Sequence, residues 1–426
     1  MGMSVKDRIR FNKRRYDIRK YLTIKNGLIL TCIITVCFIA FTVVTGMILK
    51  NKVKNSTIVY KAKNEQNVSA NNTDTSKVDN ENNTDEFEEV IGAITNVDQN
   101  ENNEEKEDNN LEPLTYNNMT ITLLGEIMMG GEVTNNLDYY YSKAFKGIYS
   151  LTNKSDFTYA NFSTNITNLE KIENAKSKYL VTKEVISGLN ALGLDCVSIA
   201  SDHITDYPSD IIKNTTKILE ENDIFVAGRQ NMPVYFEKGD KKVAIVSTNS
   251  VILGTSNNYT KNDISVYSKD NLEKNIKEAK QSADIVIADI HWGREYVYNV
   301  TSQMRQIAKV AIDAGADLVV GEHAAGVYPL EMYKGKPIIF SLGYLIGDSD
   351  LYVGKESFLF DINISKDKKL DTITMTPIYI KDKKEVMLYT DYDSTKAYSY
   401  LNQYNDWHIQ NGLNSTIKDN KIVVTF

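Results

Sequence analysis

A chain of 426 residues can form one large domain or two small ones, and its net charge of −7 argues against a general nucleic-acid-binding protein. With 42% hydrophobic and 25% charged residues, the composition is typical of a globular protein. Its three cysteines, Cys32, Cys37 and Cys196, provide no disulfide framework, because two of them lie within one apolar segment. We therefore expect no nucleic-acid partner.

The N-terminus combines a basic stretch with an apolar one. Residues 1–26 hold nine Lys or Arg and two acidic residues, whereas residues 27–49 hold no charged residue. As a helix, the apolar stretch would extend about 35 Å at 1.5 Å per residue, which is enough to cross a bilayer. The cations before it predict a basic cytoplasmic tail, a single transmembrane helix and a C-terminal domain outside the cytoplasm. A cleaved signal peptide is disfavoured, because no small-residue cleavage site follows closely.

Residues 50–112 are predicted to form a disordered linker rich in Asn, Asp and Glu. Within residues 64–112, fifteen acidic residues accompany two lysines. A segment of this composition buries too little apolar surface to offset the entropy lost on ordering. We expect it to act as a tether between the membrane and the domain that follows.

The folded domain is predicted for residues 113–426, where apolar runs alternate with helical patterns. The predicted strands cover residues 120–125, 195–200, 224–227, 243–247, 284–290, 317–320 and 338–342. The predicted helices cover residues 182–192, 210–221, 269–282 and 302–314. This alternation predicts an α/β protein with a parallel or mixed sheet covered by helices. From residue 357 the pattern changes to alternating strands such as 372–380, a helix over 394–405 and a last strand over 421–426.

Three of the four histidines follow short apolar runs that are typical of buried strands. These are His203, His291 and His323. Ligands of open α/β sheets bind outside the carboxyl ends of the strands, so the three imidazoles are expected to share one pocket. Imidazole is a common ligand of transition metals, which makes this pocket a candidate metal site.

Carboxylates accompany two of these histidines. Glu295 follows His291 by four residues, a pattern that suits a divalent metal or a histidine oriented by a carboxylate. The alternative is a solvated Glu295 beside a packed tryptophan. Asp202 and Asp206 flank His203, although Asp206 would also suit the start of the following helix.

Five segments together resemble a known family. They are LLGEIM at 123–128, YANFS at 159–163, SDHITDY at 201–207, HWGREY at 291–296 and GEHAAGVYPLEMYKGKPIIFSLGY at 321–344. Their order and spacing resemble the CapA-type capsule synthesis (poly-γ-glutamate biosynthesis) proteins over residues 119–348. The resemblance implies a calcineurin-like, metallophosphoesterase-type α/β/β/α sandwich, with residues 349–426 as additional strands and a helix. It also implies a membrane anchor, partner membrane subunits and an anionic surface polymer.

The chain departs from the family pattern at several positions, including Ser201, Glu322 and Ala324. Glu126 stands for the usual Asp, Ser163 for a Glu, Asp202 for an Asn, Ala325 for a His and Tyr344 for an Asn. Two ligands of a two-ion phosphoesterase site are therefore lost outright.

The family positions that are kept, together with the replacements Glu126 and Asp202, imply the candidate site. The candidate metal ligands are Glu126, Asp202, His203, His291, Glu295 and His323. The candidate catalytic residues are His291, His323 and Asp206, and Glu331 also keeps its family position. We expect a single divalent ion (Mn, Fe or Zn), with an empty pocket as the open alternative.

Two functions are consistent with these observations. The first is a membrane-anchored extracytoplasmic component of capsule or surface-polymer synthesis or export, which binds or scaffolds poly-γ-glutamate or a polysaccharide with weak or no catalysis. The second is a metal-dependent hydrolase of a phosphoester or polymer linkage. No nucleophile elbow is present to support a Ser/His enzyme.

Overall fold

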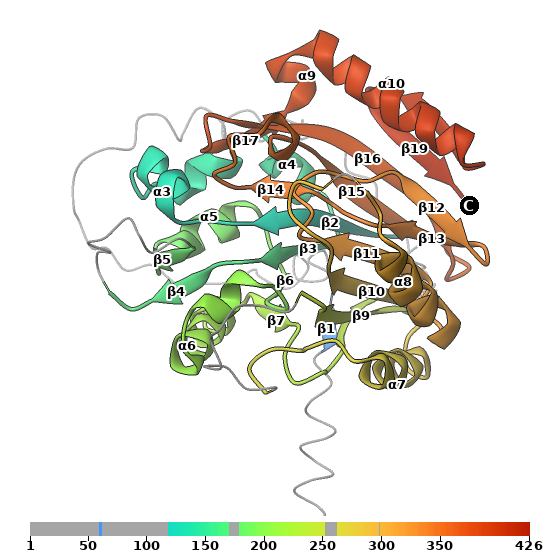
Figure 1. Ribbon diagram of the computed structural model, residues 1–426, viewed down its shortest axis with the longest axis horizontal. Coiled ribbons are helices and arrows are strands. Elements are labelled where there is room, and N and C mark those ends of the chain that lie inside the picture. Colours follow the sequence, from blue (N-terminus) through green and yellow to red (C-terminus); the bar gives the residue numbers. More distant parts are fainter. Residues whose placement is uncertain (1–58, 62–117, 170–178, 252–261, 298) are drawn as a thin grey trace, which may run out of the picture. The chain divides into compact units, whose positions relative to one another are not determined.

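The computed structural model describes residues 59–61, 118–169, 179–251, 262–297 and 299–426 (Figure 1). The predicted basic tail and transmembrane helix lie outside the described residues, as does most of the predicted linker. Within the described ranges, no helix is both long and apolar enough to cross a membrane.

One short piece of the predicted linker is a strand instead. Strand β1 (Val59–Lys61) pairs in parallel with β8 (Val234–Lys238). Val59 and Tyr60 are residue types that favour extended backbone, unlike the polar residues that dominate the rest of the predicted linker.

The first sheet is mostly parallel and has the strand order β1-β8-β9-β10-β11-β13-β12 in the described part of the chain. Its further members are β9 (Lys241–Asn249), β10 (Ile285–His291), β11 (Leu318–Glu322), β12 (Leu330–Tyr333) and β13 (Lys336–Ile339). Strands β9, β10 and β11 run parallel, so their carboxyl ends lie at one edge.

The second sheet has the order β18-β19-β16-β15-β2-β3-β6-β7, with β14 beside β2 and β17 beside β16. Its parallel strands are β2 (Met119–Ile127), β3 (Phe157–Phe162), β6 (Cys196–Ser198), β7 (Phe225–Ala227) and β14 (Tyr344–Ile346). Its antiparallel strands are β15 (Glu356–Ile364), β16 (Leu370–Lys381), β17 (Glu385–Leu388), β18 (Asn414–Lys418) and β19 (Lys421–Thr425). The antiparallel strands confirm the change of pattern predicted after residue 357.

The two sheets face one another, and side chains of alternate residues meet between them. The Phe157 and Phe236 rings lie 4.8 Å apart, one from each sheet. The Tyr159 hydroxyl on β3 donates to Asp289 on β10 across a distance of 2.6 Å. Side chains alternate between the two faces of a strand, so Asp289 and His291 share the inner face of β10.

Helices cover the outer face of each sheet (Figure 1). Helices α7 (Lys269–Lys280) and α8 (Ser302–Ala314) pack on the first sheet, in a core that includes Leu272, Ile276 and Ile307. Helices α5 (Val185–Ala191) and α6 (Ser209–Glu220) belong to the core on the second sheet. The layers therefore run helix, sheet, sheet, helix, and the predicted α/β class is confirmed.

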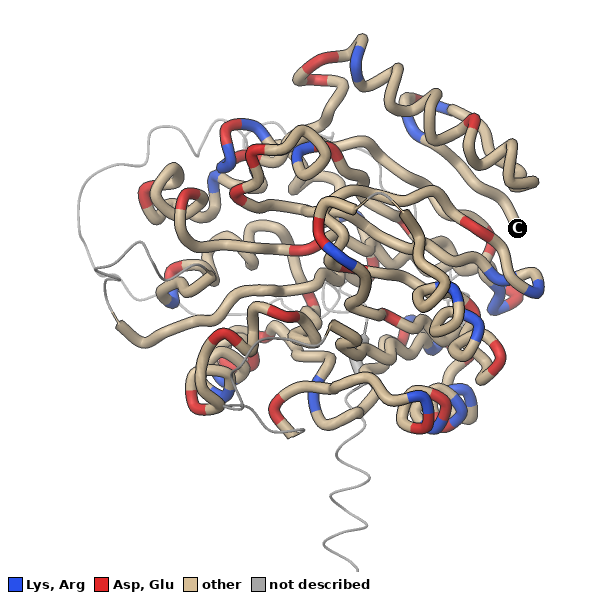
Figure 2. Tube along the Cα trace, in the orientation of Figure 1, with Lys and Arg blue, Asp and Glu red and all other residues tan. Residues whose placement is uncertain are grey.

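Local signals explain why α7 and α8 begin and end where they do. Ser268 and Thr301 accept hydrogen bonds from the backbone N–H groups of Asn271 and Met304, as N-caps do. Gly315 ends α8 in the left-handed conformation. Figure 2 shows positive and negative residues alternating along α7, which carries Lys–Glu pairs four residues apart.

The remaining elements are short, apart from the C-terminal helix. Strands β4 (Asn165–Thr167) and β5 (Leu180–Thr182) form a small parallel sheet. The short helices are α3 (Gly131–Leu137), η2 (Tyr141–Phe145), α4 (Tyr149–Thr152), η3 (His203–Asp206), η4 (Tyr352–Gly354) and α9 (Tyr389–Tyr392). Helix α10 (Ser394–Gln410) packs through Tyr400 against Phe358 of β15, with ring centroids 4.8 Å apart.

Candidate metal centre

Two rows of polar side chains meet at the carboxyl edge of the two sheets. In the second sheet, Glu126 of β2 is in register with Asn161 of β3. In the first sheet, His291 of β10 is in register with Asn249 of β9 and with Glu322 of β11. All five side chains are buried. The sheet pairing therefore assembles a polar floor from strands that lie far apart in the sequence.

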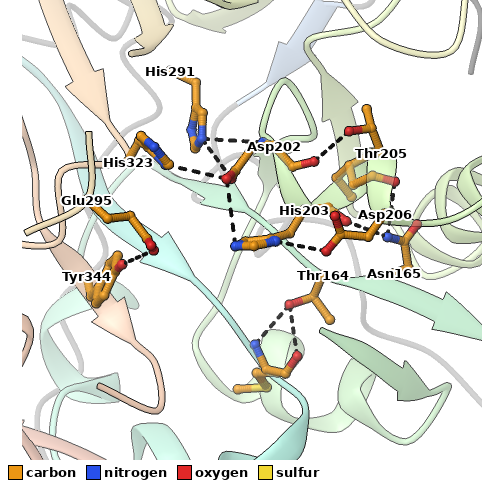
Figure 3. A network of polar contacts seen from close by, with 12 residues as sticks. Thr164, Asn165, Asp202, His203, Thr205, Asp206, His291, Glu295, His323 and Tyr344 are labelled. Carbon is orange, nitrogen blue, oxygen red and sulfur yellow. Dashed lines mark hydrogen bonds and ion pairs between the residues drawn. The ribbon is translucent and has the colours of Figure 1, made fainter. Parts of the chain in front are cut away.

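Asp202 lies at the centre of the site, in the turn after β6 (Figure 3). Its carboxylate is 3.0 Å from His291 Nε2, 3.6 Å from His323 Nδ1 and 3.7 Å from His203 Nε2. One carboxylate thus contacts all three strand-end histidines, and the predicted convergence of the imidazoles is observed.

The electrostatics of Asp202 favour its ionised form. Burial by itself would raise the pKa of Asp202, but the hydrogen bond from His291 and the nearby imidazoles hold it well below its usual range. Burial would also lower the pKa of His291, yet the hydrogen bond to Asp202 and the charge of Glu126 raise it. The pair is therefore a carboxylate facing an imidazole that holds its proton readily.

His203 has a second carboxylate partner. Its Nδ1 lies 2.8 Å from Asp206, and its ring packs against the tilted ring of Tyr179, with centroids 4.0 Å apart. Burial opposes the charged imidazole, but Asp206 and Asp202 together raise the pKa of His203 to about 9. Through this contact Asp206 orients the His203 ring.

His323 is held by an unusual backbone. Its φ is 86°, in the left-handed region that residues with a Cβ seldom adopt, and Ala325 two residues on has a φ of 65°. Such conformations cluster at functional sites, where the surrounding structure enforces them. Burial and the charge of His291 lower the pKa of His323 to about 4, so its imidazole is neutral at pH 7. A neutral imidazole is the form that binds a metal.

The arrangement fits one divalent ion. One ligand atom from each of Asp202, His291 and His323 lies within 4.8 Å of the others, and all three residues are buried. Two imidazoles and a carboxylate are a ligand set that suits Zn, Mn or Fe. The described residues contain this single group of three or more ligating side chains.

Two of the other three predicted ligands, Glu126 and Glu295, do not belong to this group. Glu126 is buried with both carboxylate oxygens lacking a hydrogen-bond partner, and burial raises its pKa to about 7. Glu295 instead accepts a hydrogen bond from the Tyr344 hydroxyl at 2.7 Å (Figure 3). Glu331, the remaining family position, binds Arg305 of α8 at 3.1 Å.

Two buried carboxylates were missing from the predicted site. Asp289 accepts hydrogen bonds from Tyr159 and from Ser247, and burial raises its pKa. Glu322 is fully buried, neither of its oxygens has a partner, and burial raises its pKa well above the usual range. Side chains alternate along a strand, so Asp289 lies on the same face as His291, and this spacing of two residues could have predicted Asp289 as part of the site.

The family model and the similar curated proteins both point to bacterial capsule synthesis proteins. Residues 120–349 match the family described as "Bacterial capsule synthesis protein PGA_cap". The chain is 26% identical over 301 residues to "Capsule biosynthesis protein CapA" of Bacillus anthracis, covering 66% of this chain and 72% of that protein. It is also 26% identical over 278 residues to "PGA biosynthesis protein CapA" of Bacillus subtilis, covering 62% and 72%.

Solved structures with similar arrangements are distant. The NAD nucleotidase NadN of Haemophilus influenzae is 12% identical with a TM-score of 0.37, covering 67% of this chain and 62% of that one. A 5'-nucleotidase precursor of Thermus thermophilus is 9% identical with a TM-score of 0.35, covering 68% and 59%.

Proposed function

Because the chain belongs to the PGA_cap family of bacterial capsule synthesis proteins, we propose that it acts in the synthesis or export of a capsular or other surface polymer. The matched residues 120–349 include both polar rows and all three histidines around Asp202, and this observation carries the proposal. The family resemblance given by the five sequence motifs is confirmed by the match.

The proposed location is the outer side of the cell membrane. The basic residues 1–26 and the apolar residues 27–49 support a single anchor with the N-terminus in the cytoplasm. Partner membrane subunits would then reach the same polymer. Membrane fractionation tests the anchor, and protease treatment of intact spheroplasts tests the side: digestion should remove the domain of residues 113–426. A full-length product in the soluble fraction would contradict the anchor.

The proposed role is to bind or guide the polymer, with weak or no catalysis. A phosphoesterase that clamps both sides of a displacement needs two metal ions and more ligands than Asp202, His291 and His323 provide. Ser163 and Ala325 replace two ligands of the family pattern, and both are fully buried. An ion held by the remaining three residues would supply a Lewis-acid centre for oxygen atoms of the polymer.

A metal-dependent hydrolase is the second candidate, and one pair of residues favours it. Asp206 keeps the imidazole of His203 protonated at neutral pH, since its pKa is raised to about 9. A protonated imidazole beside Asp202 can donate a proton to a leaving group. The substrate of such a hydrolase would be a phosphoester or a linkage within the polymer.

Gene deletion and metal analysis separate the two roles. For a binding role, deletion reduces surface polymer, a strain with His203→Ala retains most of it, and the purified full-length protein carries one ion per chain. For a hydrolase, the His203→Ala strain matches the deletion strain. Two ions per chain, with phosphodiester hydrolysis that is lost in His291→Ala, would also contradict the binding role.

A further inference from the structure

A cavity of about 560 Å³ opens beside the candidate metal centre, and we call it the acidic cavity. The carboxylates that line it are those of Glu132, Glu295, Asp348 and Asp350. Its wall also includes Tyr179, whose ring packs against that of His203 with centroids 4.0 Å apart. The acidic cavity therefore lies next to the strand-end histidines.

Two of the four carboxylates already have a cation of the protein as partner. The Lys383 ammonium lies 2.5 Å from Glu132 and 2.6 Å from Asp350. Within the described ranges, by contrast, neither Glu295 nor Asp348 forms an ion pair. Glu295 accepts one hydrogen bond, from the Tyr344 hydroxyl (Figure 3), and an ionised carboxylate has about four acceptor sites. The acidic cavity thus keeps two negative charges for a ligand.

The Tyr179 hydroxyl is a further acceptor in the same wall. Tyr179 is 8% exposed, and its hydroxyl makes no hydrogen bond in the part of the chain that the structure describes. Burial raises the pKa of this hydroxyl, and the charges of Asp348 and Glu295 raise it further, so both carboxylates lie close to it. A buried polar group without a partner costs free energy, and a ligand that donates a hydrogen bond here removes that cost.

These acceptors suit an organic ammonium group better than a metal ion. An ammonium group has three N–H donors, which matches two carboxylates and one hydroxyl. The Tyr296 ring, which is 36% exposed and lines the same cavity, can receive a cation on its face. A metal ion needs ligand atoms that converge, whereas no carboxylate of the acidic cavity belongs to a ligating group among the described residues. The volume of the cavity also fits an organic group and not a bare ion.

We propose that the acidic cavity binds the ammonium group at the amino end of an anionic, amide-linked surface polymer. This inference rests on the proposed function and names the part of the polymer that is recognised. Each internal unit of poly-γ-glutamate carries a carboxylate and no cation, so Glu295 and Asp348 repel it, whereas the amino end brings the positive charge of the chain. Two unit charges about 4 Å apart interact by an amount worth about fivefold in affinity in water, and more near a protein surface. The cavity thus selects the end of the polymer over its interior.

Acetylation of the amine tests the proposal directly. Full-length protein in detergent is titrated by calorimetry with γ-glutamate hexamers of D and of L units, each with a free or an N-acetylated amino end. We expect at least one free-amine hexamer to bind about tenfold more tightly than its acetylated form at pH 7. Because an α-amino group has a pKa of about 8, this difference should disappear at about pH 10. Equal affinities at pH 7, or no binding of any hexamer at about 10 mM, overturn the proposal.

Matched carboxylate variants locate the bound amine. Asp348→Asn keeps the size of the side chain and removes one charge, so binding of the free-amine hexamer should weaken about tenfold while the acetylated hexamer binds no less tightly. Asp367→Asn removes an exposed charge from the turn between β15 and β16 and should change neither affinity. A preference for the free amine that persists in both Asp348→Asn and Glu295→Gln overturns the proposal. Calorimetry with Ca²⁺ or Mg²⁺ alone is the second control: binding that Asp348→Asn abolishes would make the cavity a metal site and overturn the proposal as well.

The proposed function and this inference fail in different experiments. If deletion of the gene leaves surface polymer unchanged while the purified protein prefers the free-amine hexamer, the proposed function fails and the ammonium site stands. If deletion removes the polymer while the free-amine and acetylated hexamers bind equally, the function stands and the ammonium site is wrong.

Discussion

His291 at the edge between the sheets and His408 in α10 are both buried, yet their pKa values shift in opposite directions. Burial disfavours the charged imidazole at both positions. At His291, the hydrogen bond to Asp202 and the charge of Glu126 outweigh burial. At His408 burial acts by itself, and the pKa falls to about 4. The fold therefore places carboxylates near the buried imidazole of His291, whereas burial alone sets the pKa of His408.

The largest effect is expected from removing the shared carboxylate. Asp202→Ala deletes the ionised ligand that contacts three imidazoles, so affinity for Zn²⁺ or Mn²⁺ should fall about a thousandfold, equivalent to about 4 kcal/mol. Isothermal titration calorimetry on the full-length protein measures it. Asp206→Ala is the control, because Asp206 contacts His203 only, and it should change the affinity less than tenfold. Equal affinities for wild type and Asp202→Ala would contradict the site.

His408 should make the protein sensitive to acid. Its folded pKa of about 4 lies below the unfolded value of about 6.5, so the unfolded state gains the proton first as the pH falls. Its contribution to stability is fully present above pH 6.5 and is lost between about pH 6.5 and 4, by about 3 kcal/mol in all. Urea unfolding at several pH values should show a shallower loss in His408→Gln than in wild type. Parallel curves would refute the claim.

Removing one hydroxyl between the sheets tests the buried carboxylates. Tyr159→Phe deletes the hydrogen bond to Asp289 and leaves that oxygen with Ser247, so the free energy of unfolding should fall by about 1–3 kcal/mol. Tyr398→Phe, at an exposed position of α10, should change it by less than about 0.5 kcal/mol. Urea unfolding at pH 7 measures both. A neutral Tyr159→Phe would show that Asp289 needs no donor from β3.

The smallest effect concerns the paired histidine next to the centre. Asp206→Asn removes the charge that Asp206 places on His203, so the pKa of His203 should fall from about 9 by about one unit. NMR titration of the His203 ring protons follows the change, and His408 in the same spectra serves as the internal control. An unchanged His203 would mean that Asp202 supplies the whole effect.

The predicted strand ends agree with the structure where the chain is strongly patterned. The run before His291 is the strand Ile285–His291, and the run before His323 is the strand Leu318–Glu322. The helix predicted over 302–314 is Ser302–Ala314, because Thr301 caps its start and Gly315 ends it. The helix predicted over 182–192 is shorter, Val185–Ala191, because residues 180–182 join a small parallel sheet.

The sequence predicted where the pocket lies better than it predicted which carboxylates contact the histidines there. Glu322 directly precedes His323 in the sequence, but its burial follows from the register of β11 with β10. Glu295 and His291 share one loop, yet Glu295 turns to Tyr344 instead of the imidazoles. Pairing between distant strands decides such contacts, and a single sequence carries no direct signal of which strands become neighbours.

The amino-acid sequence by itself determined the α/β class, the family and the place of the pocket, because periodicity and strand-end histidines are local properties of the chain. Only the tertiary structure decided which carboxylate lies among the histidines, and which carboxylates stay buried without partners. It also decided that Tyr179, Glu295 and Asp348 line one cavity. The reason is physical: burial and charge at a site depend on segments that meet only when the two sheets pack.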